Sequence, residues 1–383
     1  MNNELYEVRV RKFKNTDKFR QAAIHFNNYG YYTAAPPGTT EYKKYWDEEM
    51  KRCKYGFTAE DGDTITGYHY FYLNYCPIMK VVKKEVPDKK GGTRTVYSKE
   101  QSLPDFWDYD KEFFDAIDEA EYVGSHAAVI KKRRSGYSFK VASMLNRNFF
   151  LIPGSVSYAI ASEAEFLTKD GVLSKAWQMM SFIDDHTAWT KKRQVHDTKM
   201  HKRASFITTK DGTQVEKGYK SEIIGITLKN DPQKARGKSG KLIVWEEAGK
   251  FPGLLDAWQI ARPSVEQDGH AYGTMIAFGT GGTTEGDYSS LKELFYHPAG
   301  YNILPVNNVW DEGAEGTPCG FFVPNYMNMQ DLMDEDGNSM IKEAIEKTNK
   351  ERRKVEQNSG DKNAIDRHIA EHPNCLHGST WVS

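Results

Sequence analysis

The sequence predicts an α/β fold, in which a central and mostly parallel β-sheet is flanked by helices. Apolar runs of strand length alternate with longer segments whose apolar residues recur at helical spacing. This alternation is typical of a doubly wound sheet, which binds ligands at the carboxyl ends of its strands. Three of the apolar runs also end in basic, acidic or glycine-rich residues. These three strand ends are therefore the place to look for a functional site.

The predicted elements follow the chain in a simple order. Residues 1–60 combine helix-like stretches with an aromatic-rich turn region, and a hairpin is expected near 81–97, around a turn of charged residues and glycines. The predicted strands cover 127–130, 156–161, 222–228, 241–245 and 272–278. The predicted helices cover 139–150, 171–182, 339–357 and 364–371. Lys140 and Arg147 are expected to face outward from the first of these helices.

The first predicted strand ends in a basic turn that resembles a phosphate loop. The residues after Ile130 are Lys131, Lys132, Arg133, Arg134, Ser135, Gly136, Tyr137 and Ser138. The usual loop, G-x-x-x-x-G-K-[ST], has its lysine between the last glycine and the hydroxyl, where this chain has Tyr137. We expect Lys131, or alternatively Lys132, to bring an ammonium to the phosphates from the other side. Taken alone, the segment also fits a basic surface turn.

A second strand, 241–245, ends in the adjacent carboxylates Glu246 and Glu247. Phosphate-loop enzymes need such a pair, because one acid helps to hold Mg²⁺ and the next orients the attacking water. We assign Mg²⁺ to Ser138 and Glu246, and the activation of water to Glu247. The alternative is a strand that ends in a solvated acidic turn.

The third strand, 272–278, opens into a glycine-rich stretch, Gly279-Thr280-Gly281-Gly282-Thr283-Thr284. The stretch contains no lysine, so a second phosphate loop is not expected here. A small hydroxyl at the end of a strand beside the acidic strand suits a residue that senses the terminal phosphate, and Thr280 is the candidate. An ordinary glycine turn is the alternative.

These three segments, in this order, resemble the ATPase domain of the large terminase subunit, the DNA-packaging motor of tailed bacteriophages. The deviant phosphate loop of that family has the form K-x-x-R-x-G-Y-S, and the matching residues here are Lys131, Arg134, Gly136, Tyr137 and Ser138. The aromatic segment 68–78 resembles the one that precedes the family's ATPase fold. The resemblance covers roughly residues 60–310.

The resemblance implies a P-loop NTPase of the ASCE type that hydrolyses ATP with Mg²⁺. It implies catalytic roles for Glu247, Arg134 and Thr280. The residues expected to bind the nucleotide are Lys131, Lys132, Arg133, Ser135, Gly136, Tyr137 and Ser138. We expect an N-terminal helical and aromatic region at 1–60, the ATPase domain at 61–325, and a C-terminal helical linker or lid at 326–383. The chain has no room for the family's nuclease domain, so no DNA cleavage is expected.

The resemblance also implies the partners of the protein, which are double-stranded DNA, the portal and procapsid, the small terminase subunit, and further copies of the chain in a ring. We expect it in the cytoplasm of the host cell and transiently on the procapsid. Arg236 lies before the acidic strand, where the family has a basic residue that can approach a nucleotide across a subunit boundary. Trp107, Tyr109 and Phe113 are candidates to frame the adenine, although aromatic residues at this spacing are more often part of a core.

Composition sets limits on these expectations. A formal net charge of -1 excludes a uniformly basic nucleic-acid coat, so DNA contacts must come from local patches. The candidate basic residues are Lys191, Lys192, Arg193, Lys199, Lys202, Arg203, Lys229, Lys234, Arg236 and Lys238. No apolar run approaches the roughly 20 residues that a membrane span requires. The four cysteines are scattered, which argues against disulfides and a zinc knuckle.

Two classes of function remain open at this stage. The first is an ATP-hydrolysing DNA translocase, and the second is a non-catalytic DNA- or capsid-binding module with a degenerate nucleotide site. Tyr137 favours the second class, because it replaces the usual lysine. Glu247 favours the first, because a binding module has no need of a carboxylate aimed at water.

Overall fold

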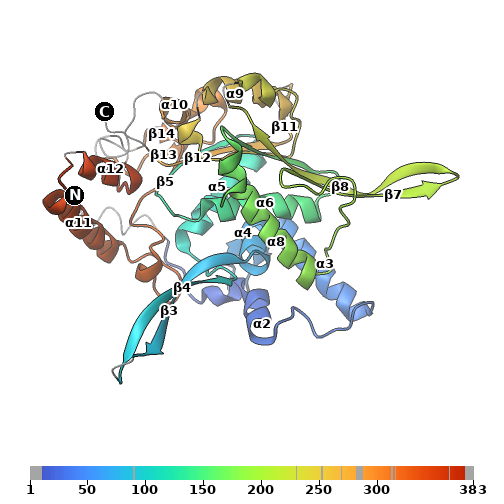
Figure 1. Cartoon of the computed structure of the whole chain (residues 1–383), viewed down its shortest axis with the longest axis horizontal. Coiled ribbons are helices and arrows are strands. Elements are labelled where there is room, and N and C mark those ends of the chain that lie inside the picture. The colour runs from blue at the N-terminus through green and yellow to red at the C-terminus, as the bar shows by residue number, and fades with distance from the viewer. Residues whose placement is uncertain are drawn as a thin grey trace.

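The computed structural model describes residues 11–88, 91–229, 231–251, 253–268, 270–281, 288–311, 314, 316–361 and 363–375. At its centre is a seven-stranded sheet with the strand order β15-β5-β12-β9-β6-β8-β7 (Figure 1). The strands are β15 (Phe321–Val323), β5 (Ala127–Lys131), β12 (Thr274–Gly279), β9 (Leu242–Trp245), β6 (Val156–Ala161), β8 (Thr213–Thr227) and β7 (His201–Lys210). Each neighbouring pair is parallel except β7 and β8, which are antiparallel. The predicted fold class is therefore confirmed.

The three motif-bearing strands are neighbours in this sheet. Strand β12 lies between β5 and β9, with Ile276 opposite both Ala127 and Val244. All residues of these three strands are buried, as is typical of parallel strands covered on both faces. Because parallel strands end at the same edge, the basic turn, the acidic pair and the glycine-rich stretch all begin there.

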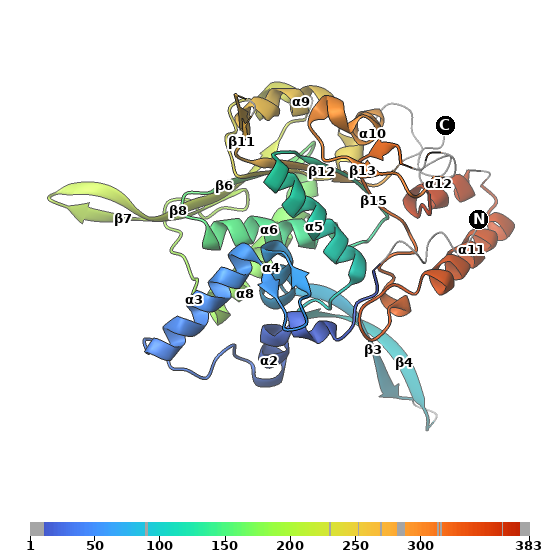
Figure 2. The same cartoon turned by 180° about the vertical axis from the view of Figure 1, so that it is seen from behind.

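Helices cover both faces of the sheet (Figures 1 and 2). One face packs on α4 (Gly67–Tyr75), α5 (Asp108–Val123), α6 (Tyr137–Leu151) and α8 (Val172–His186), through a cluster that includes Val129. The other face packs on α9 (Leu254–Ala261) and α10 (Ser289–Tyr296), through a cluster that includes Ala128 and Ile130. Alternate residues of β5 thus enter opposite cores, as the pleat of a strand requires.

Smaller elements surround this body. The remaining α-helices are α2 (Gln21–Tyr29), α3 (Thr40–Tyr55), α7 (Ala164–Thr168), α11 (Ile341–Asn358) and α12 (Ala364–Glu371). The short 3₁₀ helices are η1 (Thr16–Phe19), η2 (Pro232–Ala235), η3 (Ala248–Lys250), η4 (Arg262–Ser264), η5 (Pro298–Tyr301) and η6 (Gln330–Leu332). The strand pairs are β1 (Phe57–Thr58) with β2 (Thr64–Ile65), β3 (Ile78–Pro87) with β4 (Thr93–Ser102), β10 (Glu266–Gln267) with β11 (His270–Ala271), and β13 (Val306–Asn307) with β14 (Pro318–Cys319).

The predicted hairpin near 81–97 is present as β3 and β4, and it projects from the body (Figure 1). A second projecting hairpin, β7 with β8, extends the sheet beyond its last parallel strand. Only 222–228 of that hairpin was predicted as a strand. The rest of it has no apolar run that marks a strand.

One core joins the three predicted parts of the chain. The cluster on the α6 face of the sheet includes Phe19 and Trp46 from the N-terminal region and Ile341 and Ala344 from the C-terminal region. The aromatic segment predicted before the ATPase fold forms α4, in which every residue is buried. The predicted boundaries at residues 60 and 325 remain a prediction.

The expectation that Lys140 and Arg147 face outward from α6 was wrong. They are 1% and 7% exposed, because α6 packs against α3, α4 and α8 as well as the sheet. Arg147 donates to the carbonyls of Cys53 and Lys54, and its guanidinium lies 4.2 Å from the ring centroid of Tyr68. Among the residues that the structure describes, no helix is long and apolar enough to span a membrane.

Candidate active site

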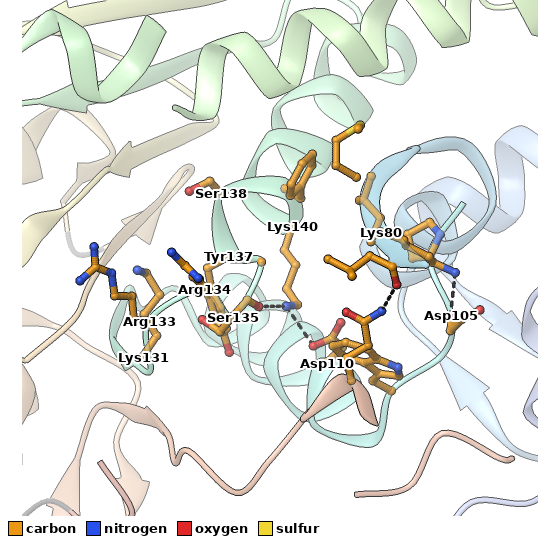
Figure 3. Close-up of a pocket in the computed structure, with 18 of the residues that line it drawn as sticks. Lys80, Asp105, Asp110, Lys131, Arg133, Arg134, Ser135, Tyr137, Ser138 and Lys140 are labelled. Atoms are coloured by element: carbon orange, nitrogen blue, oxygen red, sulfur yellow. Dashed lines mark hydrogen bonds and ion pairs between the residues drawn. The ribbon is translucent and has the colours of Figure 1, made fainter. Parts of the chain in front are cut away.

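A cleft of about 1160 Å³ lies at the carboxyl ends of β5, β9 and β12. Most of the residues predicted for the site line it. They are Lys131, Arg133, Arg134, Ser135, Gly136, Tyr137, Ser138, Glu247 and Thr280. Lys132 and Glu246 do not contribute to the cleft wall. Figure 3 shows the basic turn gathered on one side of this cleft.

The turn between β5 and α6 has the backbone shape of an anion site. Arg134 and Gly136 both have left-handed backbone, with φ of 58° and 73°. Turns of this kind direct successive N–H groups into a concavity that binds anions. Among the described residues, no acceptor is found for the amides of residues 134–136. The N–H groups of Tyr137 and Ser138 follow them directly and also have no backbone acceptor among the described residues, whereas those of Phe139 and Lys140 donate to the Gly136 carbonyl.

The two candidate lysines have separate roles. The Lys131 ammonium is 3.7 Å from Oε1 of Glu247, and both side chains face the cleft. The Lys132 ammonium instead donates to the backbone carbonyls of Asn325 and Asn328, at 3.1 Å each, and to that of Met327. The prediction that Lys132 binds the nucleotide is therefore corrected, because its three hydrogens are already used away from the cleft.

Tyr137 meets the site through its backbone rather than its ring. The side chain is 2% exposed and makes an edge contact with Phe113, with ring centroids 4.7 Å apart. Behind it, the Lys140 ammonium donates to the Ser135 carbonyl at 2.8 Å and pairs with Asp110 at 3.0 Å (Figure 3). The expected contribution of Tyr137 to nucleotide binding is thus limited to its N–H group.

Ser138 and Glu246 form an oxygen-rich pair. The Ser138 hydroxyl donates to Oε1 of Glu246 at 2.7 Å, while Oε2 is buried without a partner among the described residues. Burial raises the pKa of Glu246 to about 7, opposed by the Ser138 hydrogen bond and by the charges of Lys131 and Lys175. An unsatisfied carboxylate oxygen beside a hydroxyl suits Mg²⁺, which takes oxygen ligands. The residues present therefore fit the predicted metal.

Glu247 and Thr280 lie on two loops that touch backbone to backbone. Glu247 has left-handed backbone, with φ of 50°, and its side chain is 29% exposed in the cleft. A Cβ on Gly249 would lie 2.7 Å from the Thr280 carbonyl, and one on Gly279 would lie 2.6 Å from the Gly249 nitrogen. Glycines therefore permit this close approach of the acidic and glycine-rich loops. Gly282, Thr283 and Thr284 lie outside the described residues.

The remaining candidates divide between cleft, core and surface. Trp107 lines the cleft, whereas Tyr109 donates its hydroxyl to the Phe322 carbonyl and Phe113 is fully buried. Arg236 is exposed at the end of η2, outside the cleft wall. Sequence analysis missed Lys175, which lines the cleft from α8. No pattern marked it, because it belongs to an ordinary amphipathic helix.

No protein-family model matches the chain, and no curated protein matches it. Solved structures do match. The ATPase domain of the large terminase of Thermus phage P74-26 has 13% identity and a TM-score of 0.42, covering 65% of this chain and 87% of that domain. The HK97 bacteriophage large terminase has 14% identity and a TM-score of 0.38, covering 65% of this chain and 48% of its own.

A third match is the large terminase of another thermophilic bacteriophage, in complex with ADP, with 8% identity and a TM-score of 0.36, covering 64% of this chain and 48% of its own. The comparisons thus find large terminases, the family that the sequence motifs resemble. Because identities and TM-scores are this low, the functional proposal rests on the geometry of the cleft.

The raised pKa of Glu246 gives a testable dependence of stability on pH. A folded-state pKa of about 7, against an ordinary value of 4.5, means that the folded protein holds this proton more tightly than the unfolded chain. Stability is therefore lost as pH rises from about 4.5 to 7. Glu246→Gln has no carboxyl group to titrate and does not lose this stability. As pH rises over this range, the free energy of unfolding of the variant minus that of the parent should therefore increase, by up to a few kcal/mol. Urea titrations without divalent cations measure the free energy of unfolding of both proteins. A difference between them that does not change with pH contradicts a raised pKa of Glu246.

Proposed function

We propose that the chain is the ATP-hydrolysing motor of a terminase large subunit, which drives double-stranded DNA into a procapsid. The observation that carries the proposal is the convergence of three groups at one edge of the sheet. These are the amides of residues 134–136, which have no acceptor within the described part of the chain, the Lys131–Glu247 pair in the cleft, and the Ser138–Glu246 pair. Each matches one requirement of phosphoryl transfer, namely phosphate binding, activation of water and oxygen ligands for a metal.

In the proposed reaction, the loop amides and Lys131 hold the phosphates of ATP. The oxygen of a water molecule bonds to the γ-phosphorus as the bond to the β–γ bridging oxygen breaks. The Glu247 carboxylate accepts the proton of that water, and ADP and inorganic phosphate are the products. Mg²⁺, held by Ser138 and Glu246, supplies charge neutralisation on the phosphates when bound. Arg134, which lines the cleft from the loop itself, stabilises the charge on the transferred group.

Contacts with DNA are proposed for the segment before β9. Among the candidate basic residues at 191–203, Arg193, Lys202 and Arg203 already pair with carboxylates. In contrast, Lys234 and Arg236 are exposed and have no carboxylate partner among the described residues. Cations without partners are free to neutralise DNA phosphates, in a manner that depends on salt. The portal, the procapsid, the small terminase subunit, a ring of copies and a location in the host cytoplasm belong to the same proposal.

A non-catalytic module with a degenerate nucleotide site is the second candidate. The burial of Tyr137 at the position of the usual lysine favours it. The Lys131 ammonium beside Glu247 supports the ATPase instead, because it supplies a cation to the cleft from another position.

The first test of the proposal is Glu247→Gln. The amide keeps the shape of the side chain but cannot accept the proton of water, so ATP turnover should fall by about 10²- to 10⁴-fold while nucleotide binding survives. Phosphate release, measured with and without DNA and procapsid, reports turnover, and binding of a fluorescent ATP analogue reports affinity. A turnover rate within twofold of that of the parent would contradict the assignment of Glu247 as the residue that activates water.

The two lysines of the loop provide a matched pair of variants. Lys131→Ala should weaken ATP binding with little change in stability, because its ammonium faces the cleft. Lys132→Ala should instead lower the free energy of unfolding by about 1–3 kcal/mol, because it leaves buried carbonyl groups unsatisfied. Titration calorimetry and urea denaturation separate the two effects. If Lys132→Ala alone weakens ATP binding in a stable protein, the ammonium was assigned to the wrong residue.

Thr280→Val tests the link between hydrolysis and DNA movement. The change keeps the size of the side chain and removes the hydroxyl proposed to sense the γ-phosphate. ATP binding and some hydrolysis should remain, while the ATP consumed per length of DNA packaged should rise. The measurement uses the assembled motor with its other parts supplied. If the ATP consumed per length of DNA packaged is unchanged, residues 279–281 form a structural turn without this role.

A further inference from the structure

A further cation lines the cleft from an element that the motifs do not include. Strand β6 is the neighbour of β9, with Ile160 opposite Trp245, and the Glu246 N–H donates to the Ile160 carbonyl at 2.8 Å. The segment that leads from β6 into α8 therefore begins beside the acidic pair. Asp170 and Lys175, near the start of α8, both line the cleft.

The Lys175 ammonium is largely removed from solvent and lies close to the metal-binding pair. Its side chain is 9% exposed. The ammonium lies 5.1 Å from the ring centroid of Phe139, the residue after Ser138. The charge of Lys175 also opposes the rise in the pKa of Glu246, as expected of a cation near that carboxylate. Lys175 therefore lies on the wall of the cleft, beside the pair proposed to hold Mg²⁺.

The partner of this ammonium is weak. Lys175 donates to Oδ1 of Asp170 at 2.8 Å and to the Asp170 carbonyl. The Asp170 side chain is 97% exposed, and an ion pair with a carboxylate in water is weak because the solvent screens it. Asp170 has left-handed backbone, with φ of 55°. A Cβ on Gly171 would lie 1.8 Å from the Phe166 carbonyl, so this tight turn requires glycine and fixes Asp170 beside the lysine.

We propose that Lys175 exchanges Asp170 for the γ-phosphate when ATP binds, and returns to Asp170 when that phosphate leaves. This inference rests on the proposed ATPase function. A largely buried cation with a solvated partner gains from a multiply charged anion inside the cleft, because charges interact more strongly away from water. Lys175 would then distinguish ATP from ADP, whereas the loop amides and Lys131 hold the phosphates that both nucleotides share.

The test compares two probes, AMPPNP and ADP, each with Mg²⁺, on the full chain by titration calorimetry. Lys175→Met keeps the apolar stem and removes the charge. It should weaken AMPPNP binding by about tenfold or more, the cost of losing one charged hydrogen bond, and leave ADP binding within twofold. Asp170→Asn removes the negative charge of the partner while its backbone carbonyl stays as an acceptor, and it should tighten AMPPNP binding by about two- to fivefold, with no change for ADP.

The control is Lys169→Met, which removes an exposed neighbouring lysine that pairs with Glu165. It should leave both affinities unchanged. If Lys175→Met weakens both probes equally, or neither, Lys175 does not contact the γ-phosphate. If Lys175→Met does not fold, Asp170→Asn decides, since its carboxylate is in solvent, and an unchanged AMPPNP affinity overturns the inference. Failure of the parent to bind either probe would instead refute the proposed ATPase function.

Discussion

The shape of the turn between β5 and α6 depends on a closed ring of buried polar contacts behind it. Lys140 donates to the Ser135 carbonyl at 2.8 Å and pairs with Asp110 at 3.0 Å. Asp110 accepts from the Asn328 side chain at 2.6 Å, and the Asn328 carbonyl accepts from Lys132 at 3.1 Å. The Lys132 carbonyl then accepts from the Ser135 hydroxyl at 2.9 Å. Because an unpaired buried charge is very costly, loss of one member of the ring should destabilise the contacts of the others.

This ring accounts for the departure from the ordinary phosphate-loop pattern. Tyr137 occupies the position of the usual lysine, and its ring is part of the core. The Lys140 ammonium lies 4.6 Å from the centroid of this ring. Lys132 and Lys140, on either side of the turn, both serve to hold its backbone. The cations that line the cleft include Lys131 at the end of β5, Arg134 in the turn and Lys175 in α8. In our proposal, positive charge therefore reaches the phosphates from positions other than that of the usual lysine at the helix start.

Sequence analysis located the motif-bearing strands because each is a short apolar run buried on both faces, with its chemistry in the next few residues. It could not choose between Lys131 and Lys132, because that choice depends on carbonyls at 325–328, almost two hundred residues further along the chain. It missed most of the β7–β8 hairpin, whose pairing includes ion pairs of Arg203 with Glu216 and Glu222 rather than an apolar stripe. The meeting of the strand ends was thus predictable from the fold class, whereas the partner of a single lysine and a hairpin without an apolar stripe were not.

The same turn is fixed to the C-terminal region in two ways of unequal strength. Lys132 is held by buried carbonyls, whereas Arg133 donates its N–H to the Glu371 carbonyl at 3.0 Å and pairs with the Glu371 side chain near the surface. The Arg133 and Glu371 side chains are 55% and 42% exposed, so their ion pair adds little stability and breaks at little cost. The turn is therefore held to the C-terminal region more firmly through Lys132 than through the side chain of Arg133.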